Sequence, residues 1–201
     1  MKSISTLLFI TIFAFLLNGC AIGAIASMIV NKGDDSMPTY TASKENQTLL
    51  TSIATEGYNV NLGTFKNADE NNKSVKCRLM TNVKPPKDTT YKKYIKHAFE
   101  TEFKAAKLYH THSNVLITAT IDEIKGSSMY GNAYWSFVIT LSSSNENHYK
   151  VKSKYTYDSS FRAPSACKDM HKTFPLALQK LIHDAIINPK FKTLLYKVKK
   201  R

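Results

Sequence analysis

Alternating apolar and polar positions mark five stretches of this chain as β-strands. The stretches cover residues 58–65, 75–79, 115–124, 133–143 and 149–161. In two of the longer ones the apolar side chains fall on every second position: Val115, Ile117, Ala119 and Ile121, and then Trp135, Phe137, Ile139 and Leu141. One apolar and one polar face per strand is typical of an antiparallel sheet with one buried face and one face in water.

The first two strands are separated by the polar residues 66–73, which favour a hairpin loop. Val75, Cys77 and Leu79 alternate in the second strand and are therefore expected on its buried side. The connector 83–90 contains two consecutive prolines, which exclude both a helix and a central strand.

Two further stretches have apolar residues at helical spacing. The first stripe consists of Ile95, Ala98, Phe99, Phe103 and Ala106. Its helix is expected to be capped by Asp88, Thr89 or Thr90. The second stripe consists of Met170, Phe174, Ala177, Leu178, Leu181, Ile182, Ala185 and Ile186. Pro175 is expected to kink this second helix or to mark a boundary within it.

The order of these elements is a strand pair, a helix, three strands and a final helix. The fold that buries every apolar stripe at once is an α+β two-layer sandwich. It has a mostly antiparallel sheet of about five strands, with two main helices packed on one face. We expect this single domain to span residues 58–201. Residues 20–57 precede it as an anchor and tether, in which residues 43–55 are a candidate short helix.

The N-terminus has the pattern of a secretory signal peptide over residues 1–19. Lys2 supplies a positive charge, and an apolar run follows from Leu7 to Leu17. The run ends in a four-residue pattern that resembles a bacterial lipobox: Leu17, Asn18, Gly19 and Cys20. The resemblance implies that the Cys20 thiol is acylated and that the chain is cut before it. Each buried acyl methylene contributes about 0.8 kcal/mol to membrane binding, so two or three chains form a stable anchor.

An uncleaved membrane span is the alternative, because residues 7–30 are nearly all apolar and long enough to cross a bilayer. Asn18 and Gly19 would then lie near the middle of the span, whereas they suit a cleavage site. Ala21 after the anchor is similar to the pattern that enterobacteria release to the outer membrane. We therefore expect a lipid-anchored protein of the bacterial cell outer membrane that faces the periplasm.

Cys77 and Cys167 are the two cysteines that remain when Cys20 is acylated. An even number of cysteines in an oxidising compartment predicts a disulfide between them. This bridge closes a loop of about 90 residues and stabilises the fold by about 4 kcal/mol in the chain-entropy model. A catalytic thiol or a metal ligand is the alternative role, although neither cysteine lies in a C-x-x-C motif.

The formal net charge of +13 favours anionic neighbours such as phosphate-bearing lipid, acidic glycans or nucleic acid. A solvated surface of scattered lysines is the simpler interpretation. Lys150, Lys152 and Lys154 fall on one face of a strand, which makes them a candidate binding site for lipopolysaccharide, phospholipid or glycan. The same lysines would protect an edge strand from unwanted pairing, and we favour this second interpretation. An anchored envelope protein is not expected to bind nucleic acid.

The histidines do not form a convincing metal site in the sequence. His110 and His112 lie close together, but they follow the end of a helix and have no third ligand nearby. We expect them to be solvated loop residues. His171 and His183 flank the apolar stripe of the last helix and are expected at the surface or at its boundary.

Asp122 and Glu123 are consecutive residues of a strand, so their carboxyl groups are not expected on one face as an acid–base pair. The chain contains no G-x-S-x-G elbow, no P-loop and no G-x-G-x-x-G loop. We therefore expect a non-enzymatic protein without a cofactor or a bound metal.

Two segments, "YIKHAFETEFKAAKLY" and "YTYDSSF…LIHDAIINPKF", flank the strand meander. With it they resemble small bacterial outer-membrane lipoproteins of the YajG type. More distantly, they are similar to the LPS-assembly lipoprotein and to auxiliary lipoproteins of lipid-transport ABC systems. The resemblance covers residues 58–195 and implies a structural or accessory component of an outer-membrane or trans-envelope assembly, with a protein partner in the envelope. The alternative is a binding module for an anionic envelope ligand.

Overall fold

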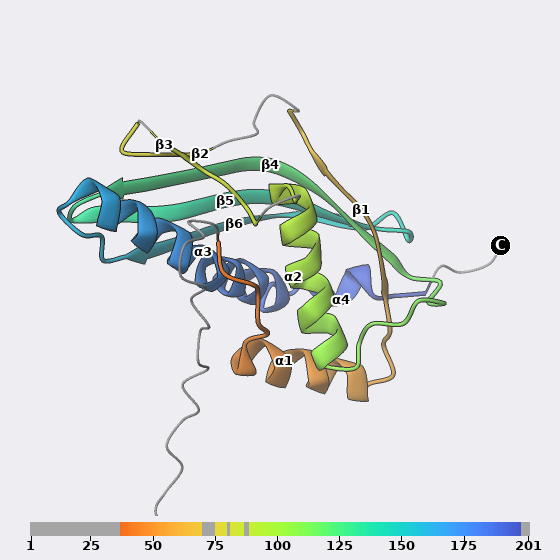
Figure 1. Cartoon of the computed structure of the whole chain (residues 1–201). Coiled ribbons are helices and arrows are strands. Elements are labelled where there is room, and N and C mark those ends of the chain that lie inside the picture. Colours follow the sequence, from red (N-terminus) through yellow and green to blue (C-terminus); the bar gives the residue numbers. More distant parts are fainter. Residues whose placement is uncertain (1–36, 70–74, 80, 87–88, 198–201) are drawn as a thin grey trace, which may run out of the picture.

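The computed structural model describes residues 37–69, 75–79, 81–86 and 89–197 (Figure 1). The expected signal peptide, the lipobox and residues 20–36 of the expected anchor and tether therefore lie outside the described residues. The helices and strands follow one another as α1 (Lys44–Thr55), β1 (Asn61–Asn67), β2 (Val75–Cys77), β3 (Thr81–Val83), α2 (Tyr91–Ala105), β4 (Leu116–Met129), β5 (Asn132–Ser143), β6 (His148–Tyr157), α3 (Ala163–Ile186) and α4 (Phe191–Leu194).

The main sheet has four strands in the order β1-β4-β5-β6. β5 pairs with both β4 and β6 in antiparallel register, whereas β1 runs parallel to β4. α2 and α3 pack along one side of this sheet (Figure 1). The α+β class, the mostly antiparallel sheet and the helices on one face are therefore confirmed.

The hairpin expected between residues 58–65 and 75–79 is wrong. β1 pairs with β4, and β2 pairs instead with β3 in a separate two-stranded sheet. α2 lies between β1 and β4 along the chain and supplies the long connection that parallel neighbours require. β2 also ends at Cys77, so Leu79 falls in the following turn and is 85% exposed, where the alternation predicted burial.

The core lies between the helices and the sheet. Every residue of the two expected helical stripes is buried, and so are the alternate apolar residues of β4 and β5. Phe174 on α3 lies among aromatic rings, with centroid distances of 4.8 Å to Trp135 and 5.5 Å to Tyr91. The indole N–H of Trp135 donates to the carbonyl oxygen of Met170 over 3.1 Å, so this buried polar group is satisfied.

The two main helices begin and continue for identifiable reasons. Thr90 caps α2, because its hydroxyl oxygen accepts a hydrogen bond from the backbone N–H of Lys93. α3 is one continuous helix through Pro175, so the expected boundary is wrong, and the alternative of a kink stays a prediction. Pro175 is buried against the core, and tertiary packing there outweighs the loss of one backbone hydrogen bond.

Residues 37–57, which the sequence assigned to the tether, pack against the rest of the structure. Met37 and Tyr40 are buried, and α1 covers α2 and α3 with Leu50 and Ile53. Within the described ranges, none of the helices is long and apolar enough to span a membrane.

Candidate functional site

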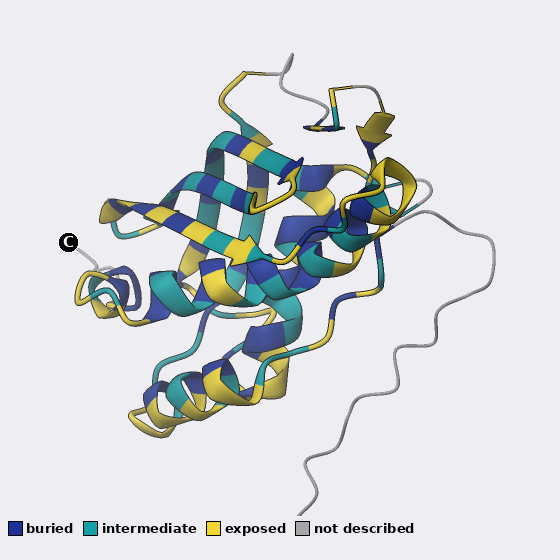
Figure 2. Ribbon diagram, turned by 90° about the vertical axis from the view of Figure 1, so that its left-hand side faces the viewer, coloured by how far each residue is buried: buried dark blue, intermediate teal, exposed yellow. Residues whose placement is uncertain are grey.

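The lysine strip, which consists of Lys150, Lys152 and Lys154, lies on β6 at one edge of the main sheet. All three lysines are exposed, whereas the intervening Val151 and Ser153 are buried, so exposure alternates along the strand (Figure 2). The strip therefore lies on the side of the sheet that faces away from α3. Both its common face and the edge position of its strand agree with the sequence pattern.

Two of the three lysines have partners within the sheet. The ammonium group of Lys150 lies 3.3 Å from the carboxylate of Asp122, which also accepts a hydrogen bond from Thr140. The ammonium group of Lys154 lies 4.7 Å from the centroid of the Tyr134 ring. An exposed pair such as Lys150–Asp122 contributes at most about 1 kcal/mol. The carboxylate nevertheless reduces the positive potential available to an anionic ligand, which favours edge protection as the role of the strip.

Asp122 and Glu123 lie on the same face of the sheet, so the sequence expectation for them is wrong. The register of β4 against β5 shifts between Ile121 and Glu123, and this β-bulge inserts Asp122 as an extra residue. Ile121 and Ile124 are both buried, which leaves the two carboxylates on the outer face. The three-residue spacing of these isoleucines was the signal for the bulge. Glu123 pairs with Lys125 over 2.6 Å and raises the pKa of that lysine.

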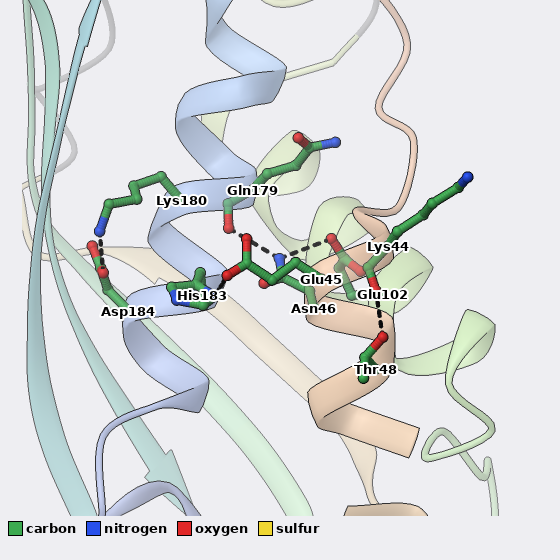
Figure 3. A network of polar contacts seen from close by, with 9 residues as sticks. All are labelled: Lys44, Glu45, Asn46, Thr48, Glu102, Gln179, Lys180, His183 and Asp184. Carbon is green, nitrogen blue, oxygen red and sulfur yellow. Dashed lines mark hydrogen bonds and ion pairs between the residues drawn. The ribbon is translucent and has the colours of Figure 1, made fainter. Parts of the chain in front are cut away.

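The histidines are dispersed. His110 and His112 are exposed in the connection between α2 and β4, as expected. His171, expected at the surface or at the boundary of the apolar stripe, is only 8% exposed, and its Nδ1 donates to the Cys167 carbonyl oxygen one turn earlier in α3. His183 is partly buried, 3.7 Å from Glu45 (Figure 3). Among the residues that the structure describes, no three His, Cys, Asp or Glu side chains are grouped to hold a metal ion.

Cys77 and Cys167 form a disulfide, with their Cα atoms 5.6 Å apart. The bond joins the β2–β3 hairpin to the first turns of α3. The sulfur of Cys77 also lies 3.2 Å from the hydroxyl of Ser128, in the part of β4 that extends beyond its pairing with β1. The disulfide therefore fixes the hairpin against both the sheet and α3.

A buried polar network, which the sequence analysis did not predict, joins α1, α2 and α3. One carboxylate oxygen of Glu102 accepts hydrogen bonds from the Tyr40 hydroxyl (2.6 Å), the Ser43 backbone N–H (2.9 Å) and the Asn46 amide (3.1 Å). The Asn46 amide also donates to the carbonyl oxygen of Gln179 on α3 (Figure 3). Glu102 thus holds the segment before α1 and the first turn of α1 against α2.

Glu102 is completely buried, and it affects the ionisation of the neighbouring Tyr40 hydroxyl. Burial and the nearby negative charge of Glu102 both raise the pKa of Tyr40 far above its ordinary value. One signal for this network was present in the sequence, since position 102 falls on the apolar stripe of α2 between Phe99 and Phe103. An acidic residue there requires buried donors from another segment.

The comparisons with known proteins do not assign the chain to a family. No protein-family model matches the sequence, and no curated protein matches it. Among solved structures, it is similar to the crystal structure of protein XCC0632 from Xanthomonas campestris, described with the family model DUF330. The two chains share 7% identity at a TM-score of 0.45, over 64% of this chain and 81% of that one. A similarity of this size assigns no function and does not confirm the YajG type.

Proposed function

We propose that this protein is a non-enzymatic lipoprotein of the bacterial outer membrane, anchored through an acylated Cys20. Its folded domain acts as an accessory or structural component of an envelope assembly, on the periplasmic side. The observation that carries the proposal is the state of the three cysteines. Two of them are joined in the disulfide Cys77–Cys167, and the third stands at the end of the lipobox pattern.

Two independent features of the chain favour this location. Disulfides form and persist in oxidising compartments such as the periplasm, and they are rare in the cytosol. The lipobox pattern of residues 17–20 follows an apolar run with the length and flanks of a signal peptide. Both features favour export from the cytosol, and they rest on different residues.

The anchor is tested by the intact mass of the protein extracted from membranes, measured with and without a reductant. The proposal predicts the loss of residues 1–19 and a mass gain from acyl chains. Reduction of the disulfide should add the mass of two hydrogen atoms. The variant Cys20→Ser is expected to lose the acyl chains and to leave the outer-membrane fraction. A full-length, unacylated wild-type mass would contradict the anchor and make residues 7–30 a membrane span.

The accessory role is tested by chemical crosslinking in intact cells, followed by affinity capture and mass spectrometry. An accessory component is expected to crosslink to one or a few envelope proteins reproducibly. The Cys20→Ser variant is the matched control, because it retains the folded domain and loses the anchor. A wild-type protein that crosslinks no more strongly than this control would contradict the accessory role.

A second candidate function is a binding module that holds lipopolysaccharide, phospholipid or glycan on the lysine strip. The alignment and exposure of the three lysines favour it. The test replaces Lys150, Lys152 and Lys154 together by Glu and measures binding to lipopolysaccharide at several salt concentrations. The matched control replaces three exposed lysines on other parts of the surface: Lys93, Lys107 and Lys190. Equal binding by both triple variants would exclude the strip as the site.

A further inference from the structure

A surface pocket of about 340 Å³ lies beside the disulfide, between the β2–β3 turn and the start of α3. Among the described residues that line it, three are basic, namely Arg78, Lys168 and His171, and none is acidic. Thr81 adds a hydroxyl group to the same wall. The pocket thus combines positive charge with hydrogen-bond donors, as a phosphate-binding site does.

Arg78 is fixed in place by several hydrogen bonds. One of its terminal nitrogens donates to the carbonyl oxygens of Ser160 (2.9 Å) and Phe161 (3.2 Å), and its backbone N–H donates to the Ser128 hydroxyl (3.0 Å). Its Nε atom is buried and has no hydrogen-bond partner among the described residues. The hydrogen bonds to Ser160 and Phe161 hold the guanidinium group, whose charge is permanent, at the wall of the pocket.

The β2–β3 turn, which contains Arg78, has an unusual backbone conformation. Arg78 and Leu79 both have positive φ angles, 48° and 59°, a region that side-chain-bearing residues rarely adopt. The disulfide at Cys77 holds the turn against α3, where Ala163 and Pro164 complete the pocket wall. Because α3 begins at Ala163, the positive end of its helix dipole lies near the same wall.

An apolar rim, which consists of Leu79, Met129, Tyr130 and Phe161, lies beside the pocket at one end of the sheet. These side chains are 85%, 54%, 67% and 79% exposed. Leu79 follows Arg78 in the turn, and the Phe161 carbonyl oxygen accepts from Arg78. The ring of Tyr130 packs edge-on against Phe161, with centroids 6.0 Å apart. The β2–β3 and β4–β5 turns and the β6–α3 connection meet at the left-hand end of Figure 1.

We infer that this pocket and its rim bind an anionic phospholipid. The phosphate lies in the pocket with Arg78, Lys168 and His171, and the acyl chains lie along the apolar rim. The charge of the pocket complements the phosphate, and exposed aliphatic and aromatic side chains next to it match the apolar part of the same molecule. The assignment is independent of the proposed anchor at Cys20 and of the lysine strip, which lies on the outer face of the sheet.

Native mass spectrometry of the full chain in a neutral detergent tests this inference. The probes are phosphatidylglycerol, diacylglycerol with the same acyl chains, and inorganic phosphate. We expect phosphatidylglycerol to bind more tightly than diacylglycerol, and inorganic phosphate to compete only weakly because it makes no contact with the rim. Equal binding of phosphatidylglycerol and diacylglycerol would overturn the phosphate site, and strong competition by inorganic phosphate would overturn the lipid assignment.

Matched variants separate the pocket from general charge. Lys168→Gln is expected to weaken phosphatidylglycerol binding about fivefold to tenfold, as for loss of one charge-assisted contact. Lys172→Gln removes the same charge one turn further along α3, at an exposed position outside the pocket, and is expected to have little effect. Phe161→Ala tests the rim and Lys152→Gln tests the lysine strip. Equal losses in Lys168→Gln and Lys172→Gln, or a loss in Lys152→Gln alone, would refute the pocket.

Arg78→Gln is a further variant whose fold must be checked, since Arg78 bonds to two backbone carbonyl groups. Circular dichroism and thermal unfolding establish whether it folds. A folded Arg78→Gln variant is expected to lose phosphatidylglycerol preference over diacylglycerol. Retention of that preference by the folded variant would contradict the role of the guanidinium group.

Discussion

The hydroxyl of Tyr40 donates to the carboxylate of Glu102 over 2.6 Å, across 62 positions of the chain. This contact links the segment that precedes α1 to the last turn of α2. Both residues are buried, so neither side of the hydrogen bond competes with water. The N-terminal segment is therefore held by a specific polar contact in addition to apolar packing.

Replacing Glu102 by Ala is expected to lower the free energy of unfolding by about 2–4 kcal/mol, because the buried Tyr40 hydroxyl and the Ser43 backbone N–H lose their acceptor and the Asn46 amide keeps only the Gln179 carbonyl oxygen. Urea denaturation measures the loss. Hydrogen exchange should also show that residues 37–57 lose protection before the sheet does. Glu100→Ala, which removes a carboxylate from the solvent side of the same helix, is the control and should change stability by less than about 0.5 kcal/mol. Equal effects of the two substitutions would contradict the role of the network.

The protein is expected to lose stability in alkali. Among the described residues, burial raises the pKa of six tyrosines above the ordinary value of 10.0: Tyr40, Tyr91, Tyr94, Tyr149, Tyr155 and Tyr157. The folded state then binds more protons than the unfolded state above pH 10, so stability is complete below that pH and falls as pH rises. Each such tyrosine contributes a decrease of up to about 1.4 kcal/mol per pH unit.

Urea denaturation at pH 8, 9, 10 and 11 measures this dependence, with ultraviolet absorbance reporting phenolate formation. Tyr149→Phe removes one buried ionisable group and should make the decrease above pH 10 shallower. It also removes the hydrogen bond to the Ala185 carbonyl oxygen, so its stability at pH 8 should be lower than that of the wild type. A constant free energy of unfolding from pH 8 to 11 would be inconsistent with buried neutral tyrosines.

Reduction of the disulfide is expected to lower stability by about 4 kcal/mol, since the bridge closes a long loop. The midpoint of urea denaturation, measured with and without a thiol reductant, reports the change. The Cys77→Ala, Cys167→Ala double variant should become insensitive to reductant and should lose hydrogen-exchange protection at the β2–β3 hairpin first. If the wild-type midpoint did not move on reduction, the bridge would have no part in holding the fold.

Truncation to alanine is expected to change the stability of the fold strongly at Phe174 and only weakly at Phe161. Phe174→Ala should cost about 3–5 kcal/mol, because it empties a site enclosed by Trp135, Tyr91 and other aromatic rings. Phe161→Ala should change stability by less than about 0.5 kcal/mol, since Phe161 is 79% exposed. Thermal unfolding of both variants provides the measurement. A large loss in Phe161→Ala would show that the apolar rim is a packing element rather than a binding surface.

Local periodicity was sufficient to predict the elements of the core. The stripes of α2 and α3 are buried as predicted, because a helix or strand displays its core face in its own sequence. Pairing was harder, since a strand's pattern does not say which neighbour it meets. β1 and β2 are adjacent in sequence and were assigned to one hairpin, yet β1 joins β4 after α2 has crossed between them.

The candidate sites also differ in how far they could be predicted from the sequence. The lysine strip follows from strict alternation on one strand, so its common face was predictable. The pocket around Arg78 depends on a turn with positive φ angles, on a disulfide and on the start of a distant helix. No single stretch of sequence contains all three. Asp122 shows the intermediate case, because its bulge left a trace in the spacing of Ile121 and Ile124.

The parallel pairing of β1 with β4 also sets an order on how the chain reaches its fold. Residues 61–67 acquire their strand partner only when residues 116–121 are present. Residues 61–67 leave the ribosome or the translocation channel well before residues 116–121. The β1 segment is therefore without its strand partner while α2 emerges. Truncations that end before residue 116 are therefore expected to misfold or aggregate, and the first half of the protein does not constitute a separate folding unit.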